Sequence, residues 1–161
     1  MILGPHYAVF LRRRADITTE QLRAGVADSL RILGERTNDE AFAAVAARLV
    51  VEANGLAFIV RDGDDRVDVL RCPGDALEQA VAKTIAELRP GLSTHGPLRD
   101  HLASTVDMFV ARFQVTAPRS SGLIAANVAR WLARDYEGMI YGAKGDWYRL
   151  GERHQFVDIT D

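Results

Sequence analysis

The chain has 161 residues, a formal net charge of −2 and 48% apolar residues, which together describe an ordinary globular protein. This length fits one domain, so we treat residues 1–161 as a single domain. The slightly negative charge argues against a nucleic-acid-binding domain, whose affinity depends on neutralising phosphates. No stretch approaches the ~20 apolar residues of a membrane span, so we expect no membrane partner.

Arginine supplies almost all of the positive charge, since lysine occurs only at Lys83 and Lys144. Together with the many alanines, this usage is typical of a GC-rich bacterial genome. The single cysteine, Cys72, forms no disulfide within the chain, which fits a reducing compartment. The short apolar stretch at 7–11 precedes the arginines at 12–14, whereas a signal peptide has the reverse order. We therefore expect a cytoplasmic bacterial protein.

The first two predicted elements are a strand over 6–12 and a helix that begins after Thr18. Both alternating sets of side chains in the strand are apolar, which favours a central strand buried on both faces. Thr18 and Gln21 form a capping box, and Gly34 predicts a left-handed exit from the helix. The helix has four apolar side chains on one face: Leu22, Val26, Leu30 and Leu33.

A second helix is predicted over the alanine-rich stretch at 41–47, with a capping box formed by Thr37 and Glu40. Its end is ambiguous, because the residues at 48–53 are strand-like and the following Asn-Gly pair fits either a helix exit or a hairpin turn. We favour a helix that ends near Val50 or Val51.

The middle of the chain predicts a hairpin and a third helix. The hairpin joins strands at 56–61 and 66–71 through the turn at 62–65, which is rich in Asp and contains a Gly. Asp75 is expected to cap the helix, and Pro90 is expected to end it.

Residues 98–115 fit both a helical face and the alternation of a strand, so the assignment of 104–115 stays open between them. The β-branched and aromatic residues there favour a strand. We predict a short helix as far as Ala103, followed by a strand that runs to Val115.

The last part of the chain predicts one long helix and three short strands. Ser120 or Ser121 caps the helix, and Gly138 ends it. The strands follow at 139–141, 147–150 and 156–159, the first two joined as a hairpin around the turn at 142–145.

This mixed order with sequential hairpins predicts an α+β fold in which helices cover a mostly antiparallel sheet. The first two-thirds can be written strand–helix–strand–strand–helix–strand, the ferredoxin-like element order with one inserted helix. A helix and a hairpin extend this order at the C-terminal end.

Neither the histidines nor the acidic turn has the residue spacing of a metal-binding motif. His95 and His101 are six residues apart, whereas two ligands on one helix face need a spacing of three or four. The acidic turn at 62–65 lacks the Gly and Glu of a calcium loop, since Val67 and Pro73 stand at those positions. We predict no metal ligand and no bound cofactor.

Catalytic patterns are absent as well. The turn at 142–145 lacks the long glycine-rich stretch and the Lys-Ser/Thr end of a phosphate-binding loop, and no serine lies in a nucleophile elbow. We therefore predict no catalytic residue and favour a protein that is not an enzyme. A site assembled only in space, from His101 or His154 with a nearby carboxylate, remains the alternative.

Three aromatic residues near the end of the chain are the candidate partner-binding residues: Tyr141, Trp147 and Tyr148. Trp147 and Tyr148 are adjacent in a predicted strand, so one of them must face away from the core that the other joins. Exposed aromatic side chains are the strongest anchors for protein partners. The alternative is that they only cover an open end of the sheet. Trp131, in contrast, is expected in the core.

The segment at 127–141, which reads NVARWLARDYEGMIY, resembles a pattern in small bacterial immunity-type proteins that are encoded beside toxins. The pattern is an amphipathic helix ending in L-A-x-x-x-x-G, then a short strand into a turn, and it covers the last quarter of this chain. Those families often have an acidic residue after the strand, where this chain has Gly142. The resemblance implies a protein partner, a cognate toxin, and no catalytic residue.

Three functional hypotheses follow. The leading one is a non-catalytic protein-binding module, namely a toxin-neutralising immunity protein. The second is a small enzyme with a His/carboxylate site that no motif marks. The third is a ligand-sensing or oligomeric regulatory domain, with a homodimer as its expected state.

Overall fold

The computed structural model describes residues 5–114, 120–142 and 144–159. In chain order its elements are β1 (His6–Leu11), α1 (Thr19–Thr37), α2 (Glu40–Arg48), β2 (Val50–Asn54), β3 (Ala57–Asp62), β4 (Asp65–Arg71), α3 (Gly74–Ala86), α4 (Pro90–Ser93), α5 (Gly96–Ala103), β5 (Asp107–Phe113), α6 (Ser120–Asp135), β6 (Gly138–Tyr141), β7 (Trp147–Leu150) and β8 (Phe156–Asp158).

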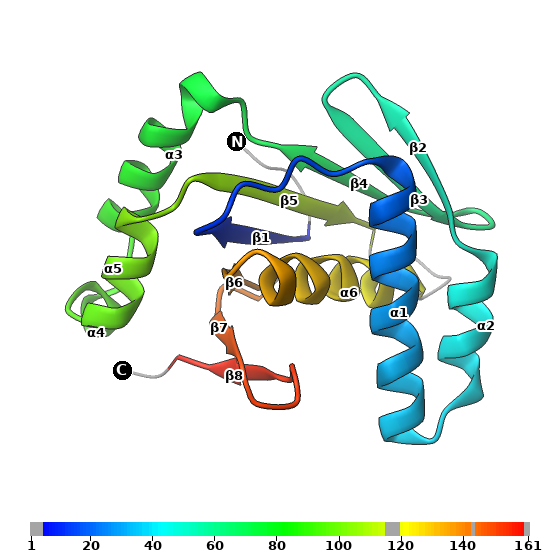
Figure 1. Ribbon diagram of the computed structural model, residues 1–161. Coiled ribbons are helices and arrows are strands. Elements are labelled where there is room, and N and C mark those ends of the chain that lie inside the picture. Colours follow the sequence, from blue (N-terminus) through cyan, green and yellow to red (C-terminus); the bar gives the residue numbers. More distant parts are fainter. Residues whose placement is uncertain (1–4, 115–119, 143, 160–161) are drawn as a thin grey trace.

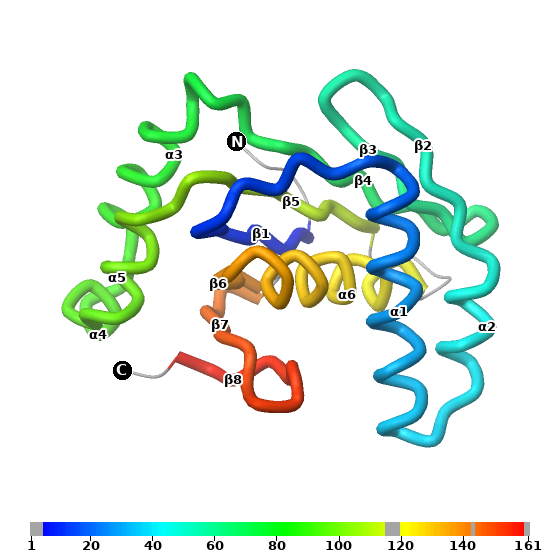
Figure 2. Tube along the Cα trace, viewed as in Figure 1, coloured from blue at the N-terminus to red at the C-terminus, as the bar shows by residue number. Residues whose placement is uncertain are grey.

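The described strands form one antiparallel sheet in the order β2-β3-β4-β5-β1-β6-β7-β8 (Figures 1 and 2). β1 lies in its interior, paired with β5 on one side and β6 on the other. The predicted α+β class, with helices covering an antiparallel sheet, is confirmed. The predicted strand–helix–strand–strand–helix–strand order is found along the chain, with β2 as an additional strand. Within the sheet, β5 lies between β4 and β1.

Helices cover both faces of the sheet, because successive side chains of a strand point to opposite faces. Val9 and Leu11 of β1 belong to the core under α1, α2 and α6. Ala8 and Phe10 belong to a second core, under α3, α4 and α5. Figure 1 shows α3, α4 and α5 together at the left and α1 and α2 at the right, with α6 running between them toward α1.

The first helix begins as predicted and ends later than predicted. Thr18 is the N-cap, and its capping box with Gln21 is complete. The helix continues through Gly34, and Asn38, at φ 54°, provides the left-handed exit instead. Gly34 serves close packing, because a Cβ there would lie 2.9 Å from the carbonyl oxygen of Asp39. Without a side chain at this position, α2 can turn back closely against α1.

The second helix differs from its prediction at both ends. Asp39, not Thr37, is the N-cap, and its carboxylate accepts a hydrogen bond from the Ala41 N–H. The helix ends at Arg48, so the prediction that it reaches Val50 or Val51 is wrong. These β-branched residues pair with β3, which makes Asn-Gly at 54–55 a hairpin turn.

The third helix also differs from its prediction at both ends. Asp75 lies inside the first turn of α3 instead of capping it, because the helix begins at Gly74 with no side-chain cap. The helix ends at Ala86, and Pro90 opens α4 instead of ending α3. Proline is well suited to that place, since the first turn of a helix leaves its N–H groups unpaired.

The long C-terminal helix shows similar shifts of its ends. Ser120 and Ser121 lie within α6, where their hydroxyls donate to the carboxylate of Asp65 and to the carbonyl of Gln114. The helix ends at Asp135, before the predicted Gly138, which instead begins β6.

The remaining predictions of elements are confirmed. These are the β3–β4 hairpin, the short helix to Ala103 followed by a strand, the β6–β7 hairpin and the edge strand β8. The predicted end of the fifth strand, Val115, and Ala143 of the predicted turn lie outside the described residues. None of the helices described has both the length and the apolar character that a membrane span requires.

Candidate functional site

A groove of about 390 Å³ lies between α3 and the sheet. We call it the α3 groove. Its floor consists of apolar side chains from the centre of the sheet, and one wall consists of residues from the second half of α3 and from the two positions after it. The lining residues are His6, Ala8, Phe10, Ala80, Lys83, Thr84, Glu87, Leu88, Met108, Tyr141 and Trp147.

The helical period of α3 explains why the groove is open. Val81 is the buried side chain of this helix and belongs to the second core. Lys83 and Glu87, one turn apart, project from another face of the helix and are exposed. They place one positive and one negative charge at the mouth of a mostly apolar groove.

Two of the three predicted partner-binding residues line this groove. The ring centroids of Tyr141 and Trp147 are 4.9 Å apart, and Trp147 also packs on Phe10 with a centroid distance of 5.4 Å. Trp147 is buried and Tyr141 is half-buried. The pair therefore forms a rigid aromatic wall, held in place from beneath by the sheet.

The third predicted residue, Tyr148, lies on the opposite face of the sheet. Its ring packs against Phe156 with a centroid distance of 5.4 Å, beside the core under α1 and α6. Burial raises the pKa of the Tyr148 hydroxyl. Trp147 and Tyr148 thus point in opposite directions, as their adjacency in a strand predicts, and each packs on its own face.

His95 and His101, the two histidines of α5 and its N-cap, make separate structural hydrogen bonds. His95 is the N-cap of α5, where its Nδ1 accepts a hydrogen bond from the Leu98 N–H at 3.1 Å. His101 is buried, and its Nε2 donates to the carbonyl oxygen of Phe10 at 2.7 Å. Within the described ranges, no three His, Cys, Asp or Glu side chains are grouped closely enough to hold a metal ion.

Burial lowers the pKa of His101 below its ordinary value of about 6.5, and this gives a prediction for the pH dependence of stability. Below that pH the unfolded chain binds a proton at His101 that the folded chain does not. The free energy of unfolding is therefore expected to fall between pH 7 and pH 5, by at most about 1.4 kcal/mol per pH unit. Urea denaturation across this range measures the slope.

The control for this prediction is His101→Gln, which keeps a hydrogen-bond donor near Phe10 but does not titrate in this range. The slope between pH 7 and pH 5 is expected to be smaller in the variant than in the natural chain. Equal slopes in the two proteins would show that His101 contributes nothing to it.

The acidic turn between β3 and β4 uses its carboxylates to hold neighbouring segments. Asp62 accepts two hydrogen bonds from Arg48, at 2.8 and 3.1 Å, which ties the turn to the end of α2. Asp65 accepts from Ser120, which ties it to α6. These oxygens point toward different partners, so they do not converge on a shared point.

The carboxylate of Glu137 lies near enough to His101 to act on its pKa, but the hydrogen bonds of the described residues do not join the two side chains. Among the hydrogen bonds of the described residues, the ring of His101 contacts only a backbone carbonyl. His154 lies beside several arginines, with no carboxylate among the residues that line the same pocket.

Comparison of the sequence with models of protein families and with curated proteins found no match, and comparison of the fold with solved structures found none either. The class of the protein is therefore defined by its own structure. It is an α+β protein with an open antiparallel sheet, helices on both faces and a mostly apolar groove beside α3.

Proposed function

We propose that this protein is a non-catalytic binding module that engages a protein partner through the α3 groove. The observation that carries the proposal is the aromatic wall of Tyr141 and Trp147 beside an apolar floor in a groove of about 390 Å³. Hot spots of protein interfaces are typically aromatic anchors in well-packed, desolvated pockets. Aromatic residues that are already ordered contribute binding energy with little loss of side-chain entropy.

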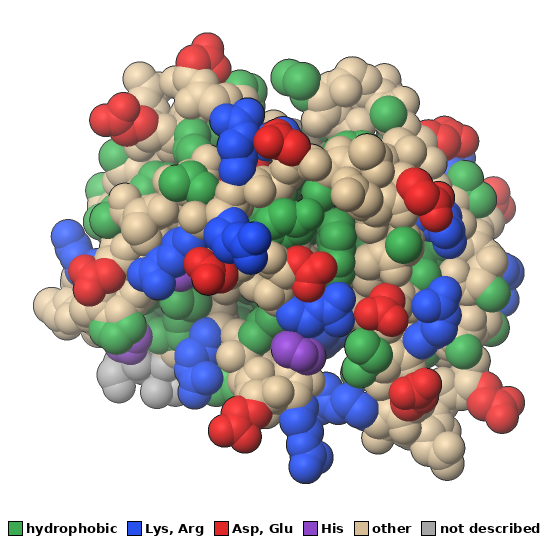
Figure 3. Space-filling model, in the orientation of Figure 1, with side chains coloured by type: hydrophobic (Ala, Val, Ile, Leu, Met, Phe, Trp, Pro, Cys, Tyr) green, Lys and Arg blue, Asp and Glu red, His purple; other side chains and the backbone are tan. Residues whose placement is uncertain are grey.

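The chemistry of the groove indicates what the partner presents. An apolar or aromatic side chain of the partner fits between Tyr141 and the apolar surface formed by Ala80 of α3 and by Leu88, just after that helix. Lys83 and Glu87 at the mouth then select a partner segment that has charges of both signs in the matching order. Figure 3 shows basic and acidic side chains interspersed on the face that it displays, without a broad field of one sign.

We further propose that the partner is a toxin encoded beside this protein and that binding neutralises it. The support for this step is the resemblance of residues 127–141 to immunity-type proteins, together with the location of Tyr141 at the end of that segment and in the wall of the groove. Localisation in the cytoplasm, where such a toxin would act, belongs to the same proposal.

The test measures binding between the purified chain and the product of the adjacent toxin gene, by calorimetry. We expect Tyr141→Ala to weaken the affinity by about 30-fold or more, because truncating a central aromatic anchor has that effect. Lys83→Glu, at an exposed position, is expected to weaken it as well, and more strongly at low ionic strength.

The matched control is Leu56→Ala, which also truncates an apolar side chain. Leu56 is 74% exposed and lies outside the groove, in the turn between β2 and β3. This variant is expected to bind as the natural chain does. Loss of affinity with Leu56→Ala but not with Tyr141→Ala or Lys83→Glu would place the interface elsewhere. A lack of any toxin binding by the natural chain would contradict the proposed function.

A further inference from the structure

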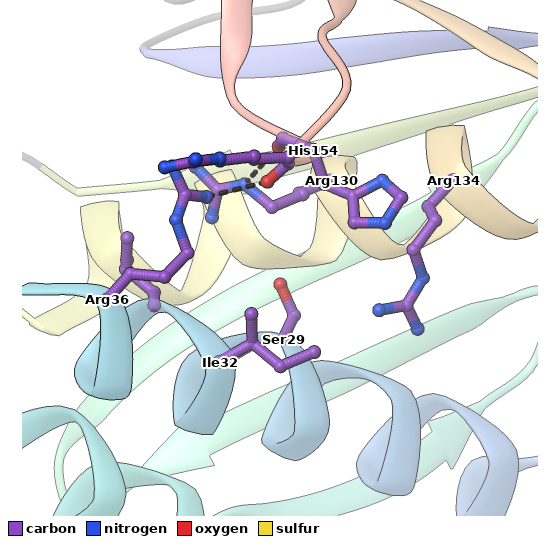
Figure 4. Close-up of a pocket in the computed structure, with 8 residues that line it drawn as sticks. Ser29, Ile32, Arg36, Arg130, Arg134 and His154 are labelled. Atoms are coloured by element: carbon purple, nitrogen blue, oxygen red, sulfur yellow. Dashed lines mark hydrogen bonds between the residues drawn. The ribbon is translucent and has the colours of Figure 1, made fainter.

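Four arginines from separate parts of the chain come together between α1, α6 and the turn that joins β7 and β8 (Figure 4). Arg36 lies in the last turn of α1, Arg130 and Arg134 lie one turn apart on α6, and Arg153 lies in the turn. His154 follows in the same turn and lines the same pocket. We call these five residues the arginine cluster.

Backbone carbonyl groups orient two of the guanidinium groups without neutralising them. Arg36 donates from Nη1 to the carbonyl oxygen of Arg153 at 2.6 Å. Arg130 donates from Nε to the carbonyl oxygen of His154 at 3.1 Å. The turn is therefore held over the helices by two charged side chains whose positive charge remains.

Carboxylate partners are scarce in the arginine cluster. Arg134 has two, Asp135 at 2.9 Å and Asp28 at 3.6 Å. Among the ion pairs of the residues that the structure describes, neither Arg36 nor Arg130 has a carboxylate partner. The cluster thus carries an excess of positive charge within one small region, although the chain as a whole is slightly acidic.

Arg130 is half-buried in partly apolar surroundings. Its guanidinium lies over the ring of Phe156, 4.8 Å from the centroid. Ile32 and Leu33 also line the pocket, so its walls are partly apolar. Burial lowers the pKa of Arg130, and the positive charge of Arg36 lowers it further. The Phe156 ring and the side-chain oxygen of Asn127, which accepts a hydrogen bond from Arg130 Nη1, stabilise this charge in part. A bound anion would add the opposite charge that the ion pairs of the described residues do not supply.

We propose that the arginine cluster is a binding site for a phosphate-class oxyanion. Guanidinium groups present paired N–H donors in a plane that matches two phosphate oxygens, which is why arginine is common in such sites. The enclosed space is only about 10 Å³, which is water-sized, so the anion sits at the mouth of the pocket. There the exposed Arg36 and Arg153 reach it, while Arg130 lies beneath.

A bound anion would connect α1, α6 and the turn between β7 and β8, so it should stabilise the folded chain. Free orthophosphate and a phosphate monoester present the same oxygens, and both fit this chemistry. The inference is independent of the α3 groove, because the arginine cluster packs with α1 and α6 and the groove lies under α3.

The experiment measures thermal unfolding and calorimetric binding of the full chain with sodium phosphate, at an ionic strength held constant with sodium chloride. At a phosphate concentration of about ten times Kd, the melting temperature is expected to rise by about 3–6 °C. Arg36→Gln and Arg153→Gln should each weaken phosphate binding by about tenfold, since each removes a charged hydrogen-bond donor. Arg31→Gln, an exposed control on the same helix, should leave it unchanged.

Adenosine monophosphate, tested in the same way, distinguishes the two sources of the anion. Tighter binding of the nucleotide than of orthophosphate assigns the site to a phosphate ester, and binding of orthophosphate alone assigns it to the free anion. The proposal is overturned if chloride at equal ionic strength gives the same stabilisation. It is equally overturned if neither anion binds, or if the Arg36 and Arg153 variants bind phosphate as tightly as the natural chain.

Discussion

Replacing Asp107 with alanine is expected to lower the free energy of unfolding by about 3–5 kcal/mol, because a buried carboxylate that accepts from an arginine and from two backbone N–H groups is removed. Asp107 opens β5 and is 3% exposed. Its two oxygens accept two hydrogen bonds from Arg71, at 2.7 and 3.1 Å. They also accept from the backbone N–H groups of Ala15 and Met108, at 2.9 and 3.0 Å.

This single carboxylate holds three segments together, since Arg71 ends β4 and Ala15 lies between β1 and α1. Alanine would leave two buried N–H groups without their acceptor, and each such loss carries a desolvation cost of about 1–3 kcal/mol. Arg71 would keep a partner in the exposed Asp16, at 3.0 Å, so most of the loss comes from the backbone donors. Urea denaturation of the natural chain and the variant gives the difference directly.

Arg66→Ala is the matched control, because Arg66 and Asp68 form an ion pair of comparable length, 2.8 Å, that is more open to solvent. Exposed pairs of this kind contribute less than about 1 kcal/mol. A double-mutant cycle of Asp107→Ala with Arg71→Ala is expected to give a coupling energy of about 1–3 kcal/mol. If Asp107→Ala costs no more than Arg66→Ala, the carboxylate does not hold these segments as described.

The parts of the fold that were predicted correctly are those whose signals lie close together in the chain. The capping box of Thr18 and Gln21 involves residues three positions apart, and it defines the start of α1. The β3–β4 hairpin is similarly local, because its turn at 62–65 joins two strands that pair with each other. In such cases the sequence near an element contains most of the information needed.

The parts that were predicted wrongly depend on contacts between distant residues. Gly34 suits a helix exit by its type, but its position against Asp39 of the following segment determines its role. Val50 and Val51 can extend a helix locally, and only the pairing of β2 with β3 makes them a strand. Tertiary contacts override local preference at these positions.

Each of the two candidate sites likewise combines residues that a local sequence signal identifies with residues that only the fold brings to the site. Tyr141 and Trp147 were identified because one hairpin brings them together, whereas the opposite wall, with Lys83, is brought there only by the packing of α3. In the arginine cluster, the spacing of Arg130 and Arg134 on α6 is a local signal that a search for basic pairs could have found. Arg36 and Arg153 join them through the fold alone.

Gly25→Val is expected to destabilise the chain by about 3 kcal/mol, at the upper end of the usual cost of overpacking a core. A Cβ at Gly25 would lie only 2.1–2.4 Å from three ring atoms of Trp131, so the indole would have to move. Trp131 is buried and also packs edge-on against Tyr136, with a centroid distance of 5.9 Å. The ring therefore has little freedom to move, and α1 and α6 would be forced apart.

The Trp131→Ala background separates this overpacking from any other effect of Gly25→Val. Trp131→Ala alone should lower the free energy of unfolding by about 3–5 kcal/mol. Because this change removes the ring, adding Gly25→Val to it should lower the free energy of unfolding by less than about 1 kcal/mol more. Gly122→Ala on α6 is the control, since its Cβ would meet nothing closer than 3.4 Å and the change should not destabilise the chain. An equal cost of Gly25→Val in both backgrounds would contradict the contact. Because Arg36 and Arg130 lie on these same two helices, the packing at Gly25 also sets the spacing across the arginine cluster.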